Sequence, residues 1–200
     1  MSDSRSPADL SNELLAEAQL SLARNLTRTA VINSYQAVET LANVVFKQMR
    51  KLQLLAQGMS EGDAEKTAED ERKKLRTDAS FLLHRGLKAA CGHSLCDEDK
   101  QKYDEILKLK ELRHQVAHAG YKPSGTEAEA GHVLSCEVLQ WLCRMGGFPV
   151  RPLLPDDRDL IPGLQTMGGD TNVLSPIGVE FLRKVLSIRP PQESCKKDDQ

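Results

Sequence analysis

The segment from residue 8 to residue 57 contains no glycine and no proline, the two residues that most often interrupt a helix. Leucine, alanine and valine recur through it every three or four residues. This spacing predicts a first helix over residues 9–25 and a second that ends near Ala56, joined by a tight turn in the polar segment 25–29. Such amphipathic helices bury their apolar stripes against each other and against further helices, so we expect an all-α fold.

The next segment is expected to lie outside the regular bundle. Residues 58–74 are the most charged part of the chain and contain two glycines, so they are predicted as a connection that becomes helical near Glu69. A third helix is predicted over residues 71–90, where leucines recur at helical spacing. Gly92 then occupies the expected position just beyond the helix end.

Two more helices complete the predicted bundle. A fourth helix is predicted to begin at Asp97. Acidic residues in its first turn interact favourably with the positive end of the helix dipole, and Gly120 ends the helix. Thr126 and Glu129 fit the pattern of a capping box for a fifth helix, which reaches Met145.

The character of the sequence changes after residue 147. Residues 148–176 are rich in proline and glycine, which argues against a regular continuation of the bundle. The polar ends of the chain have the composition of disordered segments. The predicted organisation is a disordered N-terminus over residues 1–8, a helical bundle over 9–147, and a C-terminal extension over 148–200 with one short helix at about 176–188 and a disordered end.

Charge and cysteine content narrow the class of protein. The net charge of -2 gives no basic footprint over the whole chain, so binding to nucleic acid would depend on a local patch or on a groove formed by assembly. The five cysteines are an odd number without the spacing of a secreted disulfide framework, and the N-terminus lacks the apolar core of a signal peptide. No apolar run approaches the ~20 residues of a membrane span. These features favour a cytoplasmic protein without membrane contact.

The segment most suggestive of chemistry is Arg113-His114-Gln115-Val116-Ala117-His118, at the end of the predicted fourth helix. Arginine is a permanent cation that stabilises phosphate charge, and histidine exchanges a proton near neutral pH. On a helical wheel Arg113 falls inside the apolar arc of this helix. Because a buried unpaired guanidinium is costly, Arg113 needs a carboxylate, a partner chain or a ligand phosphate. His114 and His118 lie one turn apart on a neighbouring face.

The segment 112–120 resembles the Arg-polar-x-x-x-His motif of the HEPN superfamily (higher eukaryotes and prokaryotes nucleotide-binding domains). Residues 17–39 are similar to the opening helical hairpin of that family, with small residues where two helices cross and an aromatic residue, Tyr35, in the second. Residues 126–145 are similar to its closing helix. The resemblance implies a HEPN-like up-and-down bundle of four to five helices over residues 9–145.

The resemblance also implies an activity. Many HEPN proteins are metal-independent endoribonucleases, often toxins or phage-defence effectors, that cut single-stranded RNA at a composite site in a homodimer. By this resemblance His118 would handle a proton or hold a reacting oxygen, Arg113 would hold the scissile phosphate, and His114 would orient both. Tyr121 would help to bind substrate; it follows the motif one residue later than the tyrosine of toxins that pair with a nucleotidyltransferase antitoxin. An antitoxin or regulatory protein is then a possible partner.

Two alternatives follow from the same residues. The chain would be a non-catalytic HEPN module that binds RNA, a nucleotide or a protein partner, or, more distantly, a helical adaptor. In these cases Arg113 pairs with a bundle carboxylate such as Glu39, and His118 only caps the end of its helix. Tyr35 and Glu39 are in either case the expected structural support of the motif.

Metal-binding patterns are weak in this sequence. Glu111-x-x-His114 and Glu129-x-x-His132 have the spacing of ligands in di-iron bundles, but they fall on consecutive helices, and Glu129 belongs to the predicted capping box. A zinc site would need Cys91 and Cys96 to come together with His132 and Cys136, and this spacing is not that of a standard zinc finger. The sequence therefore favours a site without a metal or cofactor.

Overall fold

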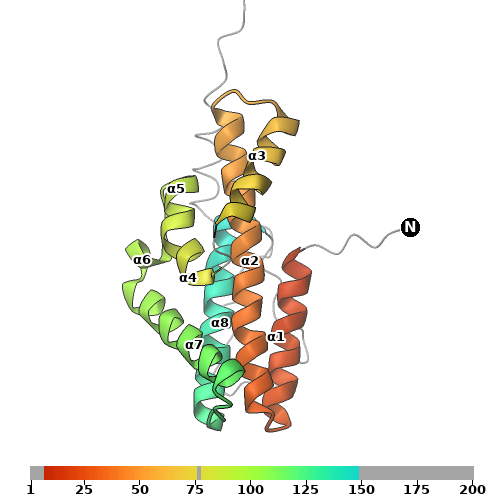
Figure 1. Ribbon diagram of the computed structural model, residues 1–200, viewed down its shortest axis with the longest axis vertical. Helices are drawn as coiled ribbons and strands as arrows, with labels where there is room; N and C mark the ends of the chain where they lie inside the picture. Colours follow the sequence, from red (N-terminus) through yellow and green to blue (C-terminus); the bar gives the residue numbers. More distant parts are fainter. Residues whose placement is uncertain (1–6, 76–77, 149–200) are drawn as a thin grey trace, which may run out of the picture.

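The computed structural model describes residues 7–75 and 78–148, and within these residues every regular element is a helix (Figure 1). The expected all-α class is therefore confirmed for this part of the chain, while the predicted helix at 176–188 and the disordered end lie outside the described residues. The elements are α1 (Pro7–Ala23), α2 (Thr27–Ala56), α3 (Glu61–Lys74), α4 (Ala79–Phe81), the π-helical turn η1 (Leu82–Gly86), α5 (Leu87–Cys91), α6 (Leu95–Glu98), α7 (Lys100–His118) and α8 (Gly125–Gly146).

The long helix α2 is the centre of the fold. Helix α1 lies antiparallel to it, α8 packs along another side, α7 runs obliquely across its lower part, and α3 lies beside its upper end (Figure 1). The turn between α1 and α2 is shorter than predicted. Asn25 adopts a left-handed conformation with a φ of 56°, which Asn tolerates better than most residues, so α2 begins at Thr27, inside the segment predicted as the turn.

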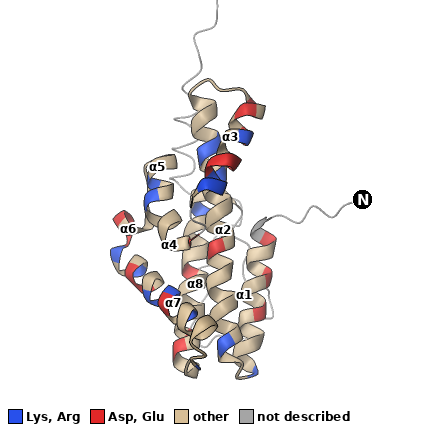
Figure 2. Cartoon of the chain, in the orientation of Figure 1, with Lys and Arg blue, Asp and Glu red and all other residues tan. Residues whose placement is uncertain are grey.

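The prediction that residues 58–74 form a connection that turns helical near Glu69 is wrong. Ser60 caps α3 by accepting a hydrogen bond from the Asp63 N–H at 3.3 Å, so the helix begins at Glu61. Only Ala64 and Ala68 of α3 are buried, and they pack with Leu54 of α2. Figure 2 marks both acidic and basic residues along the helix. The charges form ion pairs from α2 to α3: Lys47 with Glu65 and Glu69, Lys51 with Glu61 and Glu65, and Arg50 with Glu71.

The predicted single helix over residues 71–90 is also wrong. Helix α3 ends at Lys74, and the chain starts a new helical segment at Asp78, whose side chain accepts from the Ser80 N–H at 3.0 Å. This segment passes through α4, η1 and α5. Gly92 ends it in a left-handed conformation with a φ of 79°, as the sequence predicted.

Local capping also shifts the next two helix starts. The predicted fourth helix is divided, because Ser94 caps the short α6 and Asp99 caps α7. For α8, the capping box is formed by Ser124 and Glu127 rather than by Thr126 and Glu129. The Ser124 Oγ accepts from the Glu127 N–H at 3.2 Å, and the Glu127 carboxylate accepts from the Ser124 N–H at 2.7 Å.

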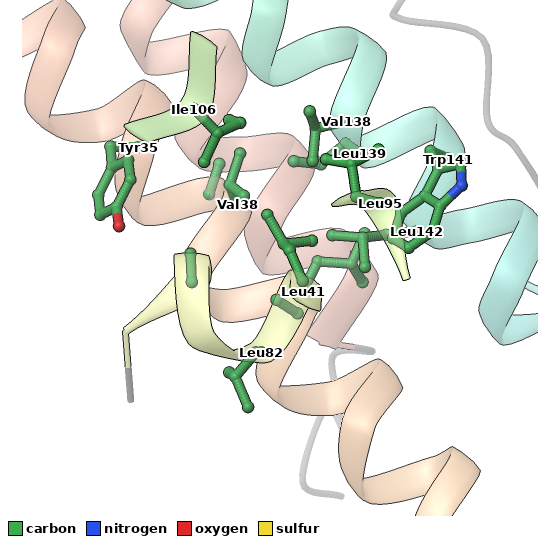
Figure 3. Packing of buried hydrophobic residues seen from close by; sticks show 14 of the residues in the cluster. Tyr35, Val38, Leu41, Leu82, Leu95, Ile106, Val138, Leu139, Trp141 and Leu142 are labelled. Atoms are coloured by element: carbon green, nitrogen blue, oxygen red, sulfur yellow. The ribbon is translucent and has the colours of Figure 1, made fainter. Parts of the chain in front are cut away.

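The core is made where α2, α7, α8 and the segment from α4 to α6 meet (Figure 3). Leu41 from α2, Leu82 from η1, Ile106 from α7 and Leu142 from α8 are each no more than 1% exposed. Burial of each such side chain stabilises the fold by about 1.5–3 kcal/mol. No helix in the described ranges is long and apolar enough to cross a membrane.

Candidate functional site

The hexapeptide forms the last part of α7, at the base of the bundle (Figure 1). The helix ends at His118, and the Ala119 N–H donates to Gln115 O at 3.0 Å. Gly120 follows in a left-handed conformation with a φ of 71°, where glycine avoids the steric cost of a side chain. The Arg28 side chain, in the first turn of α2, donates to Gly120 O. The end of α7 is thereby anchored to the start of α2.

His114 and His118 form an exposed pair on the last turns of α7. Both side chains are open to solvent, and their ring centroids lie 4.7 Å apart with 49° between the planes. This contact agrees with the helical wheel, which placed the two residues on one face. Both rings are therefore accessible to a large ligand that does not enter the core.

Arg113 lies on the more buried side of the same helix end. It is partly buried beside Val116, which belongs to the core. Burial raises the pKa of the Glu39 carboxyl on α2, and the charge of Arg113 opposes this rise, so the two groups lie near each other. Within the described residues, however, the Arg113 guanidinium makes no hydrogen bond and no direct ion pair. Its donors therefore stay available to a ligand.

Sequence reasoning missed Asp78, which joins this region of α2 to α7. The Tyr35 hydroxyl donates to Asp78 Oδ1 at 3.0 Å, and Lys110 Nζ donates to Asp78 Oδ2 and, at 3.3 Å, to Ser80 Oγ. The Ala79 backbone lies close enough to the Glu39 carboxyl to oppose the rise of its pKa. We call these side chains the interhelical cluster: Tyr35, Glu39, Asp78, Ser80, Lys110 and Arg113.

Electrostatics in the interhelical cluster favour a charged Asp78. Burial raises the pKa of the Asp78 carboxyl, but the hydrogen bonds from Lys110, Ser80 and Tyr35 outweigh this effect and hold the pKa below its ordinary value. Burial raises the pKa of the Tyr35 hydroxyl, and Asp78 raises it further, so this hydroxyl keeps its proton. The one sequence signal for this arrangement was Asp78-Ala79-Ser80, a helix-start pattern before an apolar run.

Tyr121 lies beside the end of α7 with 40% of its surface exposed. Its hydroxyl donates to the Glu127 carboxylate, 3.1 Å from Oε1 and 3.2 Å from Oε2, and these bonds raise the pKa of the hydroxyl. Tyr121 is therefore partly exposed, and its hydroxyl is hydrogen-bonded to the first turn of α8.

Comparisons with protein-family models, with curated proteins and with solved structures find no match for this chain. The functional argument therefore depends on the arrangement of the residues themselves. Arg113, His114 and His118 share one helix end. Tyr121 follows that end, and Tyr35 and Glu39 lie on the neighbouring helix α2.

The histidine and the cysteine considered as metal ligands make other contacts in the structure. His132 is 4% exposed, its Nδ1 lies 3.4 Å from Ser34 Oγ, and burial lowers its pKa, whereas Glu129 is exposed. The Cys91 thiol donates to Leu87 O at 3.1 Å, and burial raises its pKa. Over residues 7–75 and 78–148, no group of three or more His, Cys, Asp or Glu side chains is arranged to hold a metal ion.

Proposed function

We propose that the chain is a metal-independent endoribonuclease of the HEPN type that cuts single-stranded RNA. The observation that carries the proposal is the end of α7. There a partly buried arginine, which makes no direct ion pair with another described residue, is followed directly by His114 and five residues later by His118, two exposed histidines whose rings are in contact. Phosphodiester cleavage requires a cation that stabilises the phosphate charge and groups that transfer protons, and this helix end carries both kinds of side chain.

Each residue has a defined role in this reaction. His118 accepts the proton of the ribose 2′-hydroxyl as its oxygen forms a bond to phosphorus. Arg113 stabilises the charge that grows on the phosphoryl oxygens. The bond from phosphorus to the 5′-oxygen then breaks, and that oxygen takes a proton from a second imidazole or from water. The products are a 2′,3′-cyclic phosphate and a 5′-hydroxyl, and such proton transfer contributes roughly 10²–10⁴-fold to the rate.

The supporting residues fix this geometry. Glu39 attracts Arg113 without neutralising it through a direct pair, and Tyr35 holds Asp78, which in turn holds Lys110 one turn before the motif. His114 contacts His118 and orients it, and Tyr121 offers an exposed ring on which a base can stack. The complete site is composite, made by two such helix ends in a homodimer of HEPN-like bundles. An enzyme of this kind is suited to a toxin or phage-defence role under control of an antitoxin or regulatory protein.

The second candidate is a non-catalytic HEPN module that binds RNA, a nucleotide or a protein partner. The attraction between Arg113 and Glu39 favours this second candidate. An arginine whose charge is balanced by a carboxylate of its own bundle can stabilise the fold without contacting a substrate.

Incubation of the purified full chain with single-stranded RNA in EDTA tests the proposal. We expect Arg113→Ala and His118→Ala each to reduce cleavage by about 100-fold or more. His93→Ala is the matched control, because His93 is a histidine outside the interhelical cluster that pairs with Glu98, and it should cut like the wild type. Equal cleavage by all variants would remove the assigned site. Binding of RNA by the wild type without any cleavage would favour the non-catalytic module.

A further inference from the structure

An apolar pocket of about 360 Å³ lies between α2, the end of α3 and the segment from α4 to α5. It is remote from the hexapeptide along α7, which contributes none of its walls. Phe46, Leu75, Phe81, Ala89 and Ala90 supply its apolar surface. This volume is within the range of pockets that bind small molecules, about 300–1,000 Å³.

The local backbone explains why the pocket exists. In η1 the helix widens into a π turn, in which the Leu87 N–H reaches back to Leu82 O. Such turns often mark functional sites. Gly86 lies on this turn, and a Cβ there would be 3.4 Å from Phe46 Cδ2 and 3.2 Å from Leu82 Cδ2. The lack of a side chain at Gly86 allows the Phe46 ring to form one wall of the pocket.

The charges around the pocket are not balanced. Arg50 donates to both oxygens of the Glu71 carboxylate, from Nε at 2.6 Å and from Nη2 at 2.8 Å, so these two charges neutralise each other. Lys74 and Arg85 also line the pocket, and neither forms a hydrogen bond or a direct ion pair with another described residue. The pocket therefore combines an apolar interior with an excess of positive charge from these two side chains.

We propose that this pocket binds a small amphipathic carboxylate, a molecule with an apolar body and a single anionic head group. The apolar body lies against Phe46 and Phe81, and its removal from water stabilises the complex by about 25 cal/mol for each Å² buried. The carboxylate pairs with Arg85 and Lys74, and Arg85 offers the planar donor geometry that carboxylates prefer. A docked peptide helix is a poorer fit, because its row of anchor residues needs a long groove rather than one small pocket.

Titration of the full chain with decanoate, followed by calorimetry, tests the proposal. Decyltrimethylammonium has the same chain with the opposite charge, and acetate has the carboxylate without the chain. We expect decanoate to bind with one site per chain, and neither control ligand to bind detectably. Equal binding of decanoate and decyltrimethylammonium would show nonspecific apolar adsorption and would overturn the proposal, as would the absence of decanoate binding.

Variants locate the binding. Lys74→Gln and Arg85→Gln should each raise the Kd for decanoate by about threefold to fivefold, the effect of one partly solvated ion pair. Lys66→Gln, an exposed lysine of α3 outside the pocket, should leave the Kd unchanged. If the Lys66 variant weakens binding as much as the Arg85 variant, the carboxylate does not contact this pocket.

A pocket-filling variant gives an independent check. Ala89 is exposed at the edge of the pocket, so Ala89→Trp should fill the cavity without disturbing the core and should abolish decanoate binding. Ala130→Trp, at an exposed alanine of α8, is the matched control and should bind like the wild type. Circular dichroism verifies that both variants are folded. Unchanged binding by a folded Ala89→Trp variant would place the ligand elsewhere.

Discussion

At the scale of single residues, the Asp78 side chain makes more hydrogen bonds than any site residue predicted from the sequence. Its carboxylate accepts from the Tyr35 hydroxyl, from Lys110 and from the Ser80 N–H. These contacts connect α2, α4 and α7 through one side chain. An acidic residue in this position links the stability of the bundle to pH.

We expect Asp78→Asn to remove part of the acid sensitivity of the fold. The pKa of Asp78 in the folded chain lies below its ordinary value of 3.8, so its charged form stabilises the fold above that pH. This contribution is lost as the pH falls through the folded-state pKa. In urea unfolding, Asp78→Asn should therefore lower the free energy of unfolding by about 1 kcal/mol at pH 7 and by less at pH 3.

Asp70→Asn is the matched control, because Asp70 is an exposed acid on α3. It should change the free energy of unfolding little at either pH. A deficit in Asp78→Asn that is the same at pH 3 and pH 7 would mean that the charge of Asp78 does not contribute.

The residues of the candidate site differ in how far the sequence could predict their surroundings. The shared face of His114 and His118 follows from spacing within one helix, so a helical wheel sufficed. The contacts of Asp78 with Tyr35 and Lys110 join residues 43 and 32 positions apart, and only the packing of three helices brings them together. Local patterns contain no information on that packing.

At the scale of elements, helix starts decided most of the differences between prediction and structure. The periodic helices α1, α2 and α8 were predicted within a few residues of their ends because each has a wide apolar stripe. Helix α3 was missed because it buries only Ala64 and Ala68 and is held to α2 by ion pairs. Its one signal was Ser60-x-x-Asp63, a start pattern that the flanking glycines obscured.

The capping box of α8 gives a prediction at this scale. Ser124→Ala removes the hydrogen bond from the Glu127 N–H to the Ser124 Oγ but keeps the bond from the Ser124 N–H to the Glu127 carboxylate. It should lower the free energy of unfolding by about 1 kcal/mol, or the Tm by about 2–4 °C. Thr126→Ala, two residues later, leaves the bonds between Ser124 and Glu127 intact and should cost less than half as much. Thermal unfolding of both variants measures this difference. Equal losses would contradict the cap assignment.

At the scale of the whole molecule, the position of α7 decides the geometry of the candidate site. This helix crosses α2 and α8 and carries both the motif and Lys110 (Figure 1). Its contact with α8 is close because Gly131 has no side chain; a Cβ at this position would lie 2.7 Å from Leu109 Cδ1. The sequence could indicate that the helices pack together, but the angle and closeness of this crossing depend on side chains from both helices.

We expect Gly131→Leu to loosen the whole molecule and to reduce the function of the α7 end at the same time. The added side chain forces Leu109 to shift, and such overpacking typically costs about 1–3 kcal/mol of unfolding free energy. Gly62→Leu is the matched control. Gly62 lies within α3, and a Cβ added there would have no atom within 4 Å. Because leucine has a higher helix propensity than glycine, this variant should be more stable by about 0.5–1 kcal/mol. Urea unfolding measures both effects, and RNA cleavage or binding at a temperature where both variants are folded measures the consequence for the site. A Gly131→Leu variant as stable as Gly62→Leu would show that α7 can move away from α8 freely, and the site would then not depend on this crossing.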